Sequence, residues 1–164
     1  MIKIEKKHGN IWETRNAELF LVFGHAGMGL SLGQPFQDLN AAFDKNQPLE
    51  VDGKTYFLLR FDSIDYETLR VKLNEFLNYA KANNFKHLVT NGANDVTQPF
   101  PANSNPIEHK KRQCERSHQI YGIIRSWDKF ENTENSVESI TLISVASDFN
   151  EYLGDLPNNG IPNN

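Results

Sequence analysis

Apolar residues in this chain fall into short runs with the period of β-strands, separated by longer stretches with the period of helices. Residues 2–5 alternate apolar and polar side chains, as a strand with one buried face does. Leu19 to Phe23 is unbroken apolar sequence, which is typical of a central strand covered on both faces. Further short apolar segments predict a hairpin over 49–61, turning at Asp52-Gly53, and strands over 85–90 and 139–146.

Three longer segments have apolar residues at helical spacing. The clearest begins after Ser63 or Asp65, either of which can cap it, and stops at Asn83-Asn84. The other two, 35–43 and 106–130, each carry proline in the first turn. The last has a possible inner stripe of Ile107, Cys114, Tyr121, Ile124 and Trp127. Alternating strands and helices predict an α/β domain with parallel strands joined by right-handed crossovers.

Two polar loops follow predicted strands. The first holds four glycines within the ten residues 24–33, between the Leu19–Phe23 strand and a helix start. Glycines let a backbone approach a ligand closely, and a helix N-terminus attracts an anion, so this loop is either a phosphate or carboxylate site or a tight connection that binds nothing. The second loop, 91–104, is long and rich in turn formers. With the loop after 146, both would gather at the carboxyl ends of the strands, where open α/β sheets bind ligands.

Composition limits the class of protein. The 164 residues suit one domain, predicted over 1–154, with a flexible tail over 155–164. No apolar run is long enough to cross a bilayer and the start does not resemble a signal peptide, so we expect a cytoplasmic protein. A single cysteine, Cys114, and five scattered histidines indicate no disulfide and no metal site, and nothing implies a cofactor. Neither a Walker A motif nor the Rossmann glycine spacing is present.

The order of these pieces resembles the macrodomain family, whose members bind ADP-ribose. The resemblance rests on Gly9-Asn10-Ile11 after the first strand, on Asn16-Ala17 leading into the second, and on Gly27-Met28-Gly29 before a Phe-rich helix. It implies a three-layer α/β/α domain in which helices flank a mixed sheet. It also implies a ligand site formed by Asn10, Ile11, Gly24, His25, Gly27, Met28, Gly29, Leu30, Ser31, Asn91, Gly92, Ala93, Asn94 and Phe149.

Several positions depart from the family pattern. Asn10 stands where an aspartate usually accepts from the adenine amino group, and Phe23-Gly24-His25-Ala26 replaces the asparagines of hydrolytic members. Arg60 occupies the position where another branch carries a lysine nucleophile. His25 and Asp95 remain candidates for a general base and for orienting a water, or else they only hydrogen-bond the local backbone.

These departures favour a module that binds ADP-ribose or a related adenine nucleotide, free or attached to a protein, over a hydrolase. The first alternative is an ADP-ribosyl hydrolase with a non-standard site. The second is a protein or nucleic-acid interaction module acting through the predicted helix 106–130. That helix carries Lys110, Lys111, Arg112 and Arg116, which otherwise form a solvated face. A net charge of −4 argues against general affinity for nucleic acid.

Overall fold

The computed structural model describes a six-stranded sheet and two helices. The described residues are 2–9, 11, 14, 17–24, 48–60, 65–91, 106–130 and 137–144, without the side chains of 8, 24, 59–60, 106–117 and 144. The strands are β1 (Lys3–His8), β2 (Leu19–Gly24), β3 (Leu49–Val51), β4 (Lys54–Arg60), β5 (His87–Thr90) and β6 (Ser139–Ser144), and the helices are α2 (Tyr66–Ala82) and α4 (Pro106–Phe130). Each predicted strand and helix within these residues is confirmed. The predicted helix 35–43 and the tail 155–164 lie outside them.

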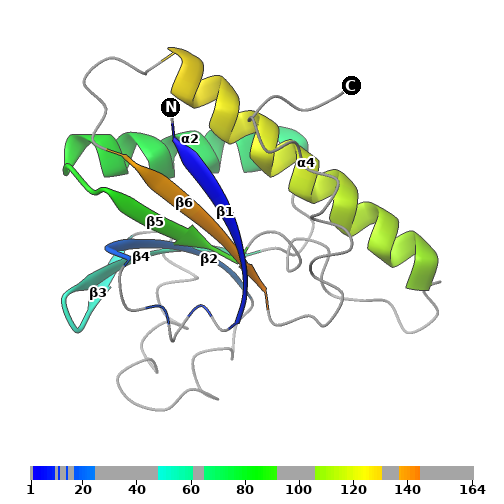
Figure 1. Ribbon diagram of the computed structural model, residues 1–164, viewed down its shortest axis with the longest axis horizontal. Helices are drawn as coiled ribbons and strands as arrows, with labels where there is room; N and C mark the ends of the chain where they lie inside the picture. The colour runs from blue at the N-terminus through cyan, green and yellow to red at the C-terminus, as the bar shows by residue number, and fades with distance from the viewer. Residues whose placement is uncertain are drawn as a thin grey trace.

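The sheet is mixed, with the order β1-β6-β5-β2-β4-β3 (Figure 1). All neighbouring pairs are parallel except β3 and β4, which form the predicted hairpin. The hairpin turns at Asp52 and Gly53, whose φ angles are 52° and 78°. Two positive φ angles are the geometry of the tight turn that matches strand twist, which explains the Asp-Gly pair.

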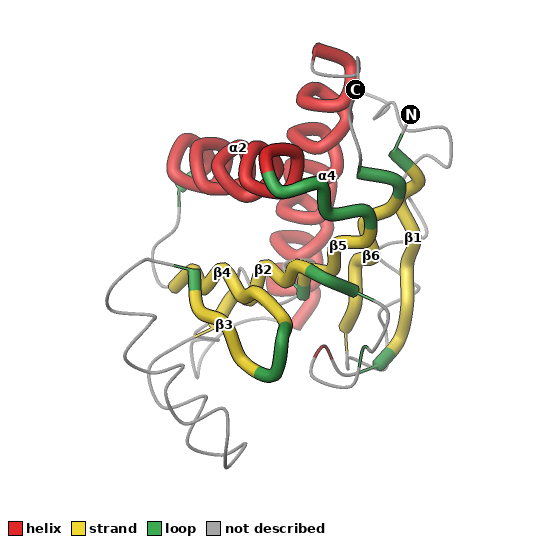
Figure 2. Tube along the Cα trace, turned by 90° about the vertical axis from the view of Figure 1, so that its left-hand side faces the viewer, coloured by secondary structure: helices red, strands yellow, loops and turns green. Residues whose placement is uncertain are grey.

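Both described helices pack on the same face of the sheet (Figure 2). Alternate residues of β2 divide between the two faces: Leu19, Leu21 and Phe23 join the helix-side core, whereas Phe20 and Val22 join a second cluster. This division explains why the β2 sequence is apolar without interruption. The helix-side core is completed by Leu69, Leu73, Phe76, Leu77 and Ala80 of α2 and by Ile120, Tyr121, Ile123, Ile124 and Trp127 of α4.

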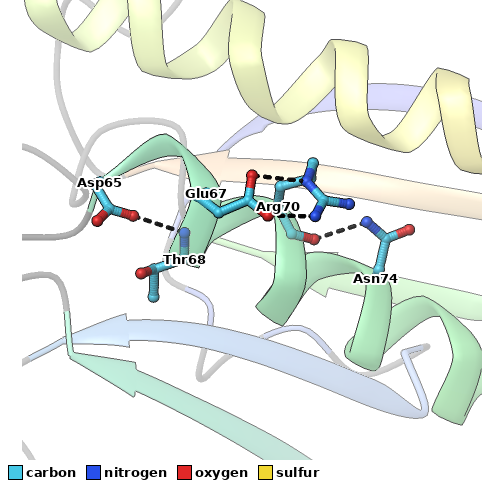
Figure 3. Close-up of polar contacts among 5 residues, drawn as sticks. All are labelled: Asp65, Glu67, Thr68, Arg70 and Asn74. Carbon is cyan, nitrogen blue, oxygen red and sulfur yellow. Dashed lines mark hydrogen bonds and ion pairs between the residues drawn. The ribbon is translucent and has the colours of Figure 1, made fainter.

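Helix α2 begins and ends as its sequence predicts. The Asp65 side chain accepts a hydrogen bond of 2.7 Å from the Thr68 N–H, which satisfies one of the free donors of the first turn (Figure 3). On the exposed surface, the hydrogen bond from Arg70 lowers the pKa of the Glu67 carboxyl. At the other end, Asn83 closes the last turn, because its N–H and side chain donate to the Tyr79 carbonyl.

A buried polar contact ties β1 to α4. Asp128 is 6% exposed and accepts a 2.8 Å hydrogen bond from the Ile2 N–H, while Arg125 donates to the Ile2 carbonyl. Arg125 and Asp128 also lie 3.6 Å apart. The residue directly before β1 is therefore held by a helix that begins more than a hundred residues later, an arrangement that the sequence pattern did not predict.

Candidate functional site at the carboxyl edge of the sheet

Strands β2, β5 and β6 end at the same edge of the sheet. β5 is parallel to both β2 and β6, so Gly24, Thr90 and Ser144 all lie at the carboxyl edge. The loops predicted to bind a ligand begin directly after these three strands. Because the three strands end at one edge, the chain leaves the sheet on the same side after each of them. The loops themselves lie outside the described residues.

The chain leaves β2 and β5 in opposite directions. After β2 it continues to β3 and β4, and β4 pairs on one side of β2. After β5 it continues through α4 to β6, which pairs on the other side of β5. Adjacent strands whose connections diverge form a topological switch point, and open α/β sheets bind ligands beyond the carboxyl ends at such a point. The glycine loop leaves the sheet here.

The Asn91 side chain joins the two strands where they part. β5 pairs with β2 only along Leu19 to Leu21, whereas β2 stays paired with β4 as far as Gly24. Beyond that ladder, the Phe23 N–H donates to Oδ1 of Asn91 at 2.8 Å, and Nδ2 of Asn91 donates to the Phe23 carbonyl at 3.1 Å. Asn91 is 5% exposed, so these bonds are shielded from water. The amide thus holds the last part of β2 against β5 after the backbone ladder has ended.

Three of the predicted ligand residues lie within the described part of the chain. Asn91 and Gly24 both lie at the switch point, and Gly24 pairs with Arg60 as the last residue of β2. Ile11 is 4% exposed and belongs to the buried cluster on the face of the sheet away from α2 and α4. That cluster also contains Val22 and Ile143, which lie near the carboxyl ends of β2 and β6. The roles of Asn10, His25, Gly27, Met28, Gly29, Leu30, Ser31, Gly92, Ala93, Asn94, Asp95 and Phe149 stay predictions, because these residues lie outside the described ones.

The structural function of Asn91 could not be predicted from the sequence pattern. Asn91 was predicted as a ligand residue. The hydrogen bonds between Asn91 and Phe23 join residues 68 positions apart in the chain. An asparagine immediately after a buried strand was the available signal, because a side-chain amide presents the same kinds of donor and acceptor as a peptide group. Only the strand order shows that Phe23 needs such a partner.

Helix α4 adds a second feature to this side of the molecule. Because it follows β5, the amino-terminal end of α4 lies on the carboxyl side of the sheet (Figure 1). The free N–H groups and dipole of a helix N-terminus favour an anion. Lys110, Lys111, Arg112 and Arg116 belong to this half of α4, which confirms their helical backbone, while their side chains lie outside the described set.

The described residues were also searched for metal-binding groups and for membrane-spanning helices. Their histidine, cysteine and acidic side chains form no group of three that could hold a metal ion. Searched over the same residues, the helices hold no stretch both long and hydrophobic enough to span a bilayer.

Comparison with solved structures finds proteins that share this fold. The macrodomain of Thermus aquaticus DarG matches with a TM-score of 0.50 and 11% identity over 85% of this chain and 97% of that one. The chain has the macrodomain fold. A mutant of tomato leucine aminopeptidase matches with a TM-score of 0.60 and 12% identity over 94% of this chain, which spans 35% of the aminopeptidase. No protein-family model and no curated protein matches the sequence. At these identities the macrodomain likeness concerns the fold alone.

Proposed function

We propose that this protein binds ADP-ribose or a related adenine nucleotide, free or attached to another protein, at the carboxyl edge of its sheet. The observation that carries the proposal is the switch point between β2 and β5, from which a loop with four glycines leaves directly after Gly24. The macrodomain fold supports the same location. In this proposal, N–H groups of residues 27–31 hold the pyrophosphate, alone or with those of 91–94.

The residues of the glycine loop favour binding over hydrolysis. Phe23-Gly24-His25-Ala26 lacks the asparagines that the macrodomain resemblance associates with hydrolysis. Within this segment, Phe23 is fully buried and its backbone N–H and carbonyl are bonded to Asn91. Phe23 therefore supplies packing and backbone pairing at a position where a hydrolase would need a polar side chain.

Calorimetric titration with ADP-ribose, NAD, AMP and cyclic dinucleotides tests the proposal. We expect saturable binding of ADP-ribose or of one of the other nucleotides. Absence of heat and of competition for all of them would remove the proposed site. Incubation with an ADP-ribosylated protein separates binder from hydrolase, because a binder retains the modified protein and releases no ADP-ribose.

The Gly29→Glu variant tests the position of the site. A side chain at residue 29 would block close backbone approach, and its carboxylate would repel the phosphates, so binding should fall below detection. Val71→Glu is the matched control, because it adds the same carboxylate at a residue of α2 that is 39% exposed. The control should keep full affinity. Equal affinity in the two variants would move the site away from the glycine loop.

A further inference from the structure

A row of polar side chains crosses three strands at the opposite edge of the sheet. In the register of the sheet, Lys3 of β1 lies beside Ser139 of β6, and Ser139 lies beside His87 of β5. Each of the three begins its strand, so the row lies at the amino edge. Leu88 and Ile140 point into the helix-side core, and successive side chains alternate along a strand. His87 and Ser139 therefore lie on the face away from α2 and α4.

His87 lies between a hydroxyl and a carboxylate. Its Nδ1 is 2.9 Å from Oγ of Ser139, and its Nε2 is 3.8 Å from Oε2 of Glu138. The carboxylate favours the tautomer with the proton on Nε2, which leaves Nδ1 to accept a hydrogen bond from the Ser139 hydroxyl. A hydroxyl, an imidazole and a carboxylate thus follow one another in the order that nucleophile, base and carboxylate have in serine hydrolases, with the partners of the two ring nitrogens exchanged.

Backbone hydrogen bonds fix this cluster to the sheet. The N–H groups of Glu138 and Ser139 donate to the Lys86 carbonyl at 2.8 and 3.1 Å. The Lys3 N–H donates to the Glu138 carbonyl at 2.9 Å. Because Ser139 and His87 belong to adjacent strands, their separation is set by the sheet rather than by a loop.

The cluster opens onto a groove of about 820 Å³. Buried Ala17 and Val89 supply apolar surface in it, next to His87 and Ser139. Its charged lining consists of three lysines against two carboxylates: Lys3, Lys6, Lys7, Glu5 and Glu138. Lys3 is partly neutralised by Glu5, 2.9 Å away. The groove is large enough for a small molecule and has a small excess of positive charge.

We propose that Ser139 is a nucleophile toward small carboxylic esters, with those that carry an anionic group preferred. Oγ of Ser139 bonds to the ester carbonyl carbon while His87 Nδ1 takes the hydroxyl proton. The bond to the leaving alcohol then breaks, and His87 returns the proton to the alcohol oxygen. A water molecule then gives a proton to His87 and bonds to the acyl carbon. The bond from that carbon to Oγ of Ser139 breaks, His87 passes the proton to Oγ, and the carboxylic acid leaves. Glu138 is a positioning residue that orients the imidazole.

A fluorophosphonate reagent tests the nucleophile directly. Attack by Ser139 forms an O–P bond and releases fluoride, so intact-mass measurement should show one adduct, and peptide mapping should place it on Ser139. Ser139→Ala should abolish the adduct. Ser126→Ala is the matched control, since Ser126 is an exposed serine of α4, and it should react like the unaltered protein. No adduct, or an adduct that survives in Ser139→Ala, would overturn the proposal.

Variants of His87 and Glu138 test their separate roles. His87→Gln should slow labelling roughly 100-fold, because it removes the base. Glu138→Gln should slow labelling less than His87→Gln does, and Glu138→Asp should label faster than Glu138→Gln. The unfolding temperature of all three variants should equal that of the unaltered protein. Equal rates in all variants would show that Ser139 reacts without this base. An excess of ADP-ribose and the Gly29→Glu substitution should both leave the labelling of Ser139 unaffected. A negative result at one of the two proposed sites therefore does not bear on the other.

Discussion

At the scale of single residues, Asn91 lies buried between the end of β5 and the last part of β2. Its amide oxygen and nitrogen bond to the Phe23 backbone in the way that a neighbouring strand would. The geometry works because a side-chain amide and a peptide group present the same donor and acceptor. Asn91 thus continues the junction of β2 and β5 at the point where the two proposed ligand loops begin.

Replacing Asn91 by alanine should reduce the stability of the fold. The change leaves the buried N–H and carbonyl of Phe23 without their partner, which costs about 3 kcal/mol in the free energy of unfolding. Urea unfolding measures this cost. Asn74→Ala is the control, since the Asn74 amide donates to the Arg70 carbonyl on the exposed surface of α2, and its cost should stay within about 0.5 kcal/mol. If Asn91→Ala and Asn74→Ala lower the free energy of unfolding equally, the hydrogen bonds to Phe23 stabilise the fold no more than an exposed bond does.

At the scale of elements, local sequence explains where α2 begins, which face it buries and where it ends. Asp65 caps it, Leu69, Leu73 and Phe76 point into the core, and Asn83 follows the last turn. The β3–β4 hairpin is equally local, because Asp52-Gly53 accommodates the positive φ angles of the turn. In α4 the pattern located Tyr121, Ile124 and Trp127 in the core, and it missed the contacts of Arg125 and Asp128 with Ile2.

Substitution of the α2 cap should weaken the helix by a predictable amount. Asp65→Ala removes the acceptor of the Thr68 N–H and should lower the free energy of unfolding by about 1 kcal/mol. Asp65→Asn keeps an acceptor oxygen at the same place and should retain most of that stability. Denaturant unfolding compares the three proteins. A loss in Asp65→Asn as large as in Asp65→Ala would show that the charge, rather than the hydrogen bond, stabilises this helix end.

At the scale of the whole molecule, the two faces of the sheet differ in what they bury. Among the described residues, the helix-side core contains most of the large fully buried side chains, while the cluster on the second face is smaller and includes Phe20 and Tyr56. Those two rings stack with centroids 4.7 Å apart. Tyr56 is 3% exposed, and burial, helped by the nearby Asp52 charge, raises the pKa of its hydroxyl above the ordinary value of 10.0.

This buried tyrosine should make the fold sensitive to alkali. In the unfolded chain Tyr56 ionises near pH 10.0, whereas the folded protein keeps it neutral to higher pH. The stability that this difference provides is complete below pH 10 and is lost as pH rises toward the folded-state pKa. Unfolding measured from pH 8 to 11 should show a steeper alkaline loss in the unaltered protein than in Tyr56→Phe, which has no group to ionise. Parallel curves would contradict this assignment.

Local sequence accounts for the described helices and strands, because capping, turn geometry and apolar periodicity act between residues close in the chain. It located the hairpin, α2 and the start and end of α4, and it predicted that polar loops leave the carboxyl ends of the strands. The strand order depends on contacts between distant segments, which local patterns do not contain. Only the tertiary structure could therefore place the switch point between β2 and β5, pair Asn91 with Phe23 across 68 positions, and bring Ser139 to His87 across 52.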